Sequence, residues 1–273
     1  MSLFDLTGKV AIVTGSSRGI GRAIAEQMAV QGAKVVISSR KIEACQEVVD
    51  AINARHGAGT AIAVPANISS KDDLQRLVDE TNRAFGKIDV LVCNAASNPY
   101  YGPMSGVSDD QFRKVLDNNV ISNHWLIQMV APQMIDRKDG SIIIVSSIGG
   151  LRGSPTIGVY NISKAADFQL ARNLAVEFGP HNVRVNCIAP GLIKTDFARA
   201  LCEDLLARQT RCHDGRNDGH DDRGDDDADE DEALGNAQRD HRPVRDGRVE
   251  PAAEYVGDAA LQRMLRLCLF AMR

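Results

Sequence analysis

The sequence has no long apolar run, so nothing in it predicts association with a membrane. None of its apolar stretches approaches the roughly 18–20 residues of a transmembrane helix. Residues 1–5 (MSLFD) carry neither the basic nor the apolar segment of a secretory signal. The six cysteines are scattered without C-x-x-C spacing. We therefore expect a reducing, cytoplasmic location.

The sequence also lacks a basic stripe with interleaved aromatic residues, so nothing in it indicates nucleic-acid binding. Its formal net charge of -4 has a local origin. Between Asp214 and Glu232 eleven residues are acidic and two are basic, and the remainder keeps 30 of the 32 basic and 25 of the 36 acidic residues. Cys212, His213 and His220 fall near this segment, but their spacing matches no metal-ligand pattern. We expect no metal site.

Residues 8–200 alternate strand-like and helix-like segments. The predicted strands are 10–13, 34–38, 60–64, 90–93, 141–145 and 183–188, and the predicted helices are 22–31, 41–56, 70–85, 109–136 and 160–178. This alternation predicts an α/β fold with a Rossmann-type, doubly wound parallel sheet and helices on both faces. Ligands bind such a sheet at the carboxyl ends of its strands. We predict a single domain over residues 1–208.

The first predicted strand runs directly into a glycine-rich turn, residues 14–21 (TGSSRGIG), which opens a helix. Gly15 allows the sharp turn, Gly19 lets a diphosphate approach the backbone, and Gly21 lets helix and strand pack closely. The helix N-terminus offers unpaired N–H groups and a positive dipole end to phosphates. The spacing is G-x3-G-x-G rather than the commoner G-x-G-x-x-G. The turn alone is also compatible with a plain strand–helix connection.

A serine, a tyrosine and a lysine at a defined spacing indicate proton-transfer chemistry. Ser147 precedes Tyr160 by thirteen residues, and Lys164 follows it by four, one turn along the same helix face. A phenol has a free pKa of about 10, and an ammonium one turn away lowers that pKa by stabilising the phenolate. The serine can hold a substrate oxygen while the tyrosine delivers or removes its proton. Alone, a Tyr-x3-Lys pair is more often a solvated surface pair.

Two further motifs accompany these residues in order: residues 94–96 (NAA) after the fourth predicted strand and residues 190–195 (PGLIKT) after the sixth. The whole set resembles the short-chain dehydrogenase/reductase (SDR) family over residues 7 to about 200. The resemblance implies an NAD(P)-dependent oxidoreductase in which hydride passes between a substrate carbon and nicotinamide C4. It places the family's catalytic tetrad on Asn119, Ser147, Tyr160 and Lys164.

The resemblance also implies a role for each member of the tetrad. Tyr160 would be the general acid–base, and Ser147 would orient the carbonyl or alcohol. Lys164 would lower the tyrosine pKa and bind the nicotinamide ribose, and Asn119 would hold a water that links Lys164 to bulk solvent. The motifs place the cofactor-binding positions at Gly15, Ser17, Arg18, Gly19, Ile20, Gly21, Ser39, Arg40, Asn67, Ile68, Asn94, Ala95, Ala96, Tyr160, Lys164, Pro190, Gly191, Ile193 and Thr195.

Two of these positions depart from the family pattern. Ala96 stands where the family usually has the glycine of N-A-G, which is a mild change. Asn67 stands where an aspartate usually lies near the adenine. Its side-chain oxygen can still accept one hydrogen bond from the adenine amino group.

The residues after the second predicted strand favour NADP(H) over NAD(H). NAD-specific members place an aspartate there to bind the ribose 2′-hydroxyl. Here Ser39 is followed by Arg40 and Lys41, and Arg18 lies in the glycine turn. A guanidinium suits a 2′-phosphate that an acid would repel. The alternatives are an NAD-dependent alcohol dehydrogenase, in which these residues only begin a solvated helix, and a non-catalytic nucleotide-binding protein.

The predicted substrate is a small carbonyl or alcohol compound. Residues 98–102 (NPYYG) follow the fourth strand and should line the pocket, where two tyrosines and a proline suit a mostly apolar molecule. Within the family, the motifs are most similar to NADPH-dependent carbonyl and retinol reductases.

The regular pattern ends near Arg208. Residues 209–273 form an atypical acidic tail, and residues 209–250 have so few large apolar residues that we expect disorder. The family's last strand is therefore missing or altered, through a frameshift or a genuine extension. Resequencing the DNA across codons 200–273 tests the frameshift, which an error-free frame encoding this tail would exclude. We expect a homodimer through the helices at 109–136 and 160–178, and no tetramer if the tail is genuine.

Overall fold

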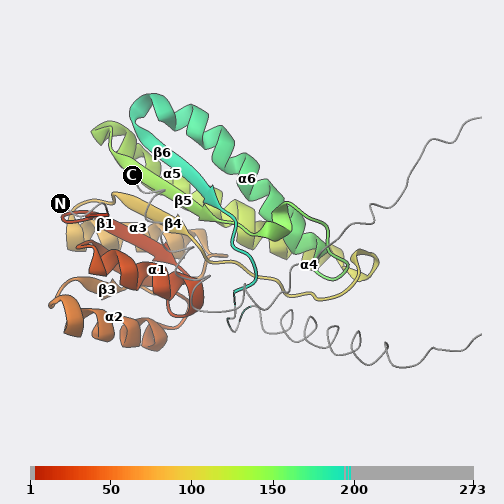
Figure 1. Cartoon of the computed structure of the whole chain (residues 1–273), viewed down its shortest axis with the longest axis horizontal. Helices are drawn as coiled ribbons and strands as arrows, with labels where there is room; N and C mark the ends of the chain where they lie inside the picture. The colour runs from red at the N-terminus through yellow and green to blue at the C-terminus, as the bar shows by residue number, and fades with distance from the viewer. Residues whose placement is uncertain (1–3, 194, 196, 198–273) are drawn as a thin grey trace, which may run out of the picture.

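Six parallel strands form the central sheet of the described part of the protein. The computed structural model describes residues 4–193, 195 and 197. Its strands lie in the order β3-β2-β1-β4-β5-β6 (Figure 1). Their bounds are β1 Val10–Thr14, β2 Lys34–Ser38, β3 Ala61–Ala63, β4 Val90–Cys93, β5 Gly140–Val145 and β6 Val183–Ile188. All six predicted strands are confirmed, each to within one residue at either end.

The order of the strands creates a switch point between β1 and β4. The chain runs outward from β1 through β2 to β3, then returns to pair β4 with the other side of β1. Because these strands are parallel, their carboxyl ends meet at one edge of the sheet. In doubly wound folds the crevice outside this edge receives the ligand, so the fold predicts a site after β1 and β4.

Helices cover both faces of the sheet. On one face α1 (Gly19–Val30) and α2 (Ile42–His56) pack against alternate strand residues. On the other face α3 (Lys71–Phe85), α5 (Ser122–Arg137) and α6 (Gly158–Phe178) do the same. A sheet covered on both faces needs apolar residues at almost every strand position. This explains why the strands read as continuous apolar runs rather than as alternating patterns.

The segment predicted as one helix over residues 109–136 has a different structure. It is divided into α4 (Asp109–Leu116), a π-helical turn η2 (Asp117–Ile121), and α5. The wider turn inserts one residue into the helical repeat and presents buried Asn118 and Asn119 to neighbouring segments. The apolar periodicity continues on both sides of the turn, so the sequence pattern gave no sign of the break.

A charged cluster lies at the opposite, amino-terminal end of the strands. The Asp89 side chain is buried, and its Oδ2 accepts a hydrogen bond from Val10 N at 2.9 Å. Lys87 Nζ lies 2.9 Å from the same oxygen, and Arg137 lies 3.7 Å from Oδ1. The carboxylate thus joins β1, the start of β4 and α5. It is a structural feature away from the edge where the ligand site is expected.

Several predictions concern residues outside the described ones. They include the acidic tail at 209–273 with its expected disorder at 209–250, the altered last strand, the domain boundary at 208, and the absence of a metal site at Cys212, His213 and His220. Among the described residues, no helix has the length and apolar character needed to cross a membrane.

Candidate active site

The glycine-rich turn between β1 and α1 has the backbone geometry that its sequence predicts. Gly15 and Gly19 adopt φ angles of 65° and 57°, a region that favours glycine. A Cβ atom on Gly21 would clash with the carbonyl oxygen of Gly15 and come within 2.5 Å of Asn94 Nδ2. Only a glycine at position 21 therefore allows α1 to lie this close to the turn and to β4.

Two hydroxyl groups fasten the turn to the sheet. Ser16 Oγ donates to Val13 O at 2.6 Å and accepts from Ser38 N at 2.9 Å, which joins the turn to β2. Thr14 Oγ1 accepts hydrogen bonds from Asn94 N and Ala95 N, both at 3.0 Å. The glycine-rich turn, which we call the cofactor cradle, is therefore fixed by β2 on one side and by the segment after β4 on the other.

Asn94 also fastens the turn through its own side chain. Its Nδ2 donates to Thr14 O at 2.8 Å and to Gly15 O at 3.2 Å. The small residues at 94–96 let the backbone come close to the turn, since a Cβ on Gly15 would lie 3.0 Å from Ala95 Cα. Ala96 follows as a partly exposed residue.

The start of α1 fits a diphosphate group. The helix begins at Gly19, and its N-cap residue Arg18 supplies no side-chain hydrogen bond to the first turn. The first-turn N–H groups and the positive end of the helix dipole therefore face the turn without a side-chain cap. Ser17, Arg18 and Ile20 flank this start, with Arg18 exposed. These features match the chemistry of a dinucleotide cofactor.

The loop after β6 reaches the same place. Pro190 O accepts a hydrogen bond from Ile148 N at 3.0 Å, and Ile193 is buried in the core. A Cβ atom on Gly19 would lie 3.4 Å from Thr195 Cγ2, so the loop extends to the glycine turn. Exposed Gly191 lies between them. The described residues of the 190–195 motif thus form a loop that extends to the glycine turn.

The positions predicted for the adenosine half of the cofactor follow β2 and β3. Ser39 and Arg40 come directly after β2, with Arg40 exposed. Ala66 N donates to Ser39 O at 3.0 Å, which places Asn67 and Ile68 beside them. Asn67 Oδ1 already accepts a hydrogen bond from Ser69 N at 3.2 Å. Only its remaining lone pair is available to an adenine amino group.

The structure brings Ser147, Tyr160 and Lys164 together at the carboxyl end of β5. Ser147 follows β5 and accepts a hydrogen bond from Gly149 N at 3.0 Å. Tyr160 and Lys164 come from the first turns of α6, and Lys164 Nζ lies 5.6 Å from the centre of the Tyr160 ring. The lysine side chain is only 2% exposed, and its Nζ donates to Val145 O at 2.9 Å.

Burial and charge act on the Tyr160 phenol in opposite directions. Burial raises the pKa of Tyr160 above its ordinary value, while the Lys164 ammonium and the Ser147 hydroxyl lower that pKa. The effect of the lysine is the one predicted. Desolvation is the larger influence, and the sequence spacing contains no information about it.

Asn119 is fully buried in the π turn, where its side chain braces the site. Its Nδ2 donates to Ser97 O at 3.0 Å and to Ser163 Oγ at 2.9 Å, and its Oδ1 accepts from Ser97 N at 2.8 Å. All the hydrogen-bonding hydrogens of the amide are therefore used within the protein. The water contact that the resemblance implies would have to use the main-chain oxygen of Asn119, which also accepts from Asn123 Nδ2 at 2.7 Å.

Asp167 is the residue that the sequence reasoning missed. Its side chain is fully buried on α6, and its Oδ2 lies 3.0 Å from Lys164 Nζ. The signal in the sequence is an acid three residues after the lysine, on a helix otherwise packed against the sheet. An i, i+3 acid–base pair is usually a surface feature, so the pattern did not distinguish it from a solvated pair.

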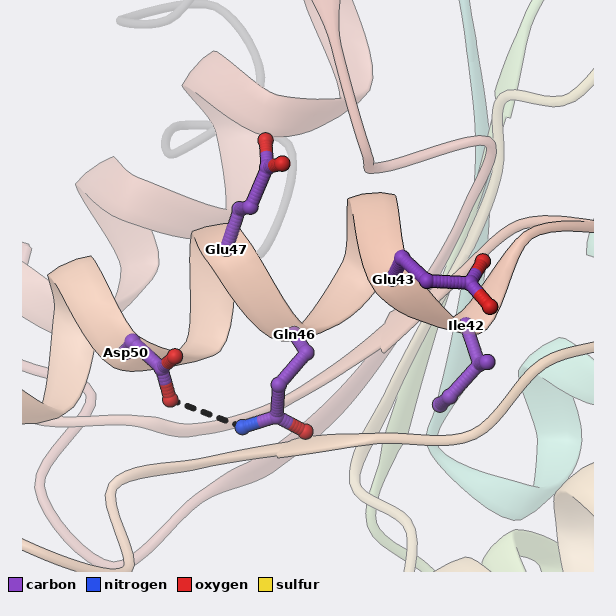
Figure 2. Close-up of a pocket in the computed structure, with 5 residues that line it drawn as sticks. All are labelled: Ile42, Glu43, Gln46, Glu47 and Asp50. Atoms are coloured by element: carbon purple, nitrogen blue, oxygen red, sulfur yellow. Dashed lines mark hydrogen bonds between the residues drawn. The ribbon is translucent and has the colours of Figure 1, made fainter.

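A shallow hollow on α2 lies apart from this site (Figure 2). It is lined by Ile42, Glu43, Gln46, Glu47 and Asp50, with Gln46 Nε2 donating to Asp50 Oδ1 at 2.7 Å. Its carboxylates would repel the phosphates of a dinucleotide. The described residues contain no group of three or more histidine, cysteine or acidic side chains placed to hold a metal ion.

Comparisons with known proteins agree with this geometry. The family model of the short chain dehydrogenases matches residues 9–206. Dehydrogenase/reductase SDR family member 4 from Bos taurus is 44% identical over 201 residues, which cover 73% of this chain and 71% of the relative. The Homo sapiens protein of the same name is 44% identical over 200 residues, 73% of this chain and 71% of that protein.

A solved structure gives the same result. A short-chain type dehydrogenase/reductase from Mycobacterium marinum superposes with a TM-score of 0.71 at 32% identity, covering 77% of this chain and 82% of that one. The chain belongs to the short-chain dehydrogenase/reductase family. It is an NAD(P)-dependent oxidoreductase.

Replacing Gly21 by alanine tests the cofactor cradle. The added methyl must displace the turn or Asn94, so we expect Gly21→Ala to lose the rise in melting temperature that a saturating nicotinamide cofactor gives. At about 100 times its Kd, a ligand stabilises the folded state by roughly 2.7 kcal/mol, which thermal melting detects readily.

Gly179→Ala is the matched control, because Gly179 has a φ of -53° and nothing near the added atom. This variant should keep the full shift. A full cofactor shift in Gly21→Ala would show that the diphosphate does not bind at this turn.

Proposed function

We propose that the protein interconverts a carbonyl and a secondary alcohol with NADP(H), using Tyr160 as the general acid–base. The observation that carries this proposal is the grouping of Ser147, Tyr160 and buried Lys164 at the end of β5, next to the glycine turn. A nicotinamide cofactor, when bound, supplies or accepts the hydride. The remaining steps belong to this chain's own side chains.

Each of the three side chains has a defined task in carbonyl reduction. Gly149 N donates to Ser147 Oγ, and the serine's own hydroxyl, which hydrogen-bonds Tyr160 in the protein without substrate, can donate to a substrate oxygen instead. The Tyr160 hydroxyl donates its proton to that oxygen, and the Lys164 ammonium stabilises the phenolate that remains. Alcohol oxidation uses the same groups in reverse, starting from the phenolate.

The preference for NADP(H) rests on the charges at the end of β2. The residue after the strand is Ser39, and exposed Arg40 and Lys41 follow it before α2 begins at Ile42. A 2′-phosphate placed there meets a guanidinium and an ammonium instead of a carboxylate. The first acid on α2 is Glu43, inside the helix.

The proposed substrate is a mostly apolar carbonyl compound, because segments next to the site residues carry exposed apolar side chains. The exposed ones are Tyr101, Met104, Ile148, Leu151 and Phe197. The Phe197 ring lies 6.0 Å from the Tyr160 ring, and exposed apolar groups gathered at a site indicate an apolar ligand. Similarity in motif to carbonyl and retinol reductases supports the same substrate class.

The loop after β4 and the loop before α6 carry several of these exposed apolar side chains, and the two loops are hydrogen-bonded to each other. Gly102 pairs with Ile157 in an isolated bridge, and Gly102 N donates to Thr156 O at 2.8 Å. Within the first loop, Tyr100 directs its hydroxyl to Pro103 O at 2.9 Å. Tyr101 is therefore the tyrosine of the NPYYG segment left for contact with a substrate.

Homodimer formation and a cytoplasmic location belong to the same proposal. Ile162 and Val176 expose apolar side chains on one side of α6, with Val176 80% exposed, and such a surface favours a partner copy. Cys45, Cys93 and Cys187 are free thiols, which is compatible with a reducing compartment.

Tyr160→Phe tests the proposed chemistry. Removal of the hydroxyl should lower kcat for a panel of apolar ketones and aldehydes by about 10²-fold or more, while the thermal shift with NADPH remains. Steady-state kinetics and melting curves on the same preparations separate the two effects. Unaltered turnover in this variant would remove Tyr160 from the mechanism. Cofactor binding without turnover in the parent protein would favour the non-catalytic alternative.

Arg40→Ala tests the cofactor preference. Loss of a charge-assisted contact to the 2′-phosphate should weaken NADPH binding by about 1.5–3 kcal/mol, or roughly tenfold to 100-fold in Kd. NADH lacks that phosphate, so its affinity should hardly change. Fluorescence titration with both cofactors measures this difference. Arg55→Ala, at the far end of α2, is the control and should alter neither affinity. Equal losses for both cofactors would contradict the proposal.

A further inference from the structure

A fully buried carboxylate lies directly beside the lysine of the site. The Asp167 side chain is 0% exposed and Lys164 is 2% exposed, so both charges are removed from water. Each buried charge is unfavourable alone, and their contact at 3.0 Å compensates both. The pair is therefore a feature that the fold must hold in place.

Both oxygens of Asp167 have partners from different elements. Oδ2 accepts from Lys164 Nζ on α6, and Oδ1 accepts from Asn123 Nδ2 on α5 at 3.3 Å. The same Nδ2 group donates to the main-chain oxygen of Asn119 at 2.7 Å. A continuous hydrogen-bonded chain of protein groups thus connects Lys164 to the π turn.

The lysine is held from two sides. Its ammonium donates to Val145 O at the end of β5 and to Asp167, and an ammonium has three hydrogens to donate. The third is left for the nicotinamide ribose or a water. Asp167 therefore does not need to release Lys164 when the site is in use.

We propose that Asp167 is a positioning residue: its carboxylate, anchored by Asn123, fixes the Lys164 ammonium at the end of β5 and offsets part of that ammonium's charge at Tyr160. The inference depends on the proposed function only for the task of Tyr160. The pairing itself is a property of the folded chain without cofactor.

The charge of Asp167 has a direction of effect on Tyr160. A carboxylate near the phenol makes the phenolate less favourable, and it raises the Tyr160 pKa against the lowering by Lys164. The phenol then stays protonated to higher pH. A protonated Tyr160 is the form that carbonyl reduction needs, and the charge of Asp167 helps to keep it in that form against the effect of Lys164.

The other groups that face Asp167 do not cancel its charge. They are Asn123 from α5, the Cys93 thiol from β4 and the Cys187 thiol from β6. Burial and the nearby carboxylate raise the pKa of both thiols, which stay neutral in the working pH range. Lys164 is thus the only cation that acts strongly on Asp167 among the described residues.

The experiment is a spectroscopic titration of Tyr160 in the full-length protein without cofactor. Phenolate absorbance is recorded from about pH 8 upward past the ordinary tyrosine pKa of about 10, until the Tyr160 titration is complete, and the spectrum of Tyr160→Phe is subtracted to isolate this residue from the other tyrosines. For the Asp167→Asn variant, the spectrum of the double variant Asp167→Asn/Tyr160→Phe is subtracted in the same way. Circular dichroism on each sample confirms the fold.

We expect Asp167→Asn to move the Tyr160 titration about one pH unit lower, which means about tenfold more phenolate at a given pH below the midpoint. The amide keeps an oxygen acceptor for Lys164, so the ammonium remains in place. An unchanged titration, or a move to higher pH, overturns the proposal. If Asp167→Asn does not fold, Asp167→Thr gives the same test, because it keeps an oxygen acceptor.

Asp89→Asn is the matched control, since Asp89 is a second buried aspartate with a lysine partner, at the other end of the strands. It should lower the melting temperature and leave the Tyr160 titration unchanged. If Asp89→Asn moves the Tyr160 titration as far as Asp167→Asn does, the shift comes from a general loss of stability rather than from the charge of Asp167. Failure of the proposed function would appear separately, as turnover that survives Tyr160→Phe.

Discussion

A lysine side chain buried inside the folded protein is the constraint on which this site depends. Water normally stabilises an ammonium group, and the Lys164 side chain has almost no contact with solvent. The chain compensates with a carbonyl from β5, a carboxylate from α6 itself and, through Asn123, an amide from α5. These partners come from three elements, so the position of the lysine is set by the packing of α5 and α6 on the sheet rather than by α6 alone.

The π turn follows from the same requirement. Asn119 must use both its side-chain amide and its main-chain oxygen, the first toward Ser97 and Ser163 and the second toward Asn123. A helix without the extra residue would orient the Asn119 side chain differently relative to α5. One extra residue in the turn satisfies both needs, and it explains why an irregular segment persists inside an otherwise long helix.

Features that depend on order along the chain could be predicted, and features that depend on burial could not. The strands, the glycine turn and the Ser147–Tyr160–Lys164 spacing are all local patterns, and the fold placed them as expected. The π turn, Asp167 and the direction of the Tyr160 pKa depend on which neighbours exclude water. An acid three residues after a lysine has the same sequence pattern on a surface and in a core.

The short segment after β4 joins the glycine turn to the grouped Ser147, Tyr160 and Lys164, the proposed proton-transfer groups. Asn94 at its start fastens the glycine turn through Thr14 and Gly15, and Ser97 three residues later fastens Asn119. A displacement of this segment would therefore disturb both halves of the site together. Because hydride and proton must reach neighbouring atoms of one substrate, a shared support keeps the two halves in register. The sequence places these residues after the strand at the switch point, which is the position that borders both halves.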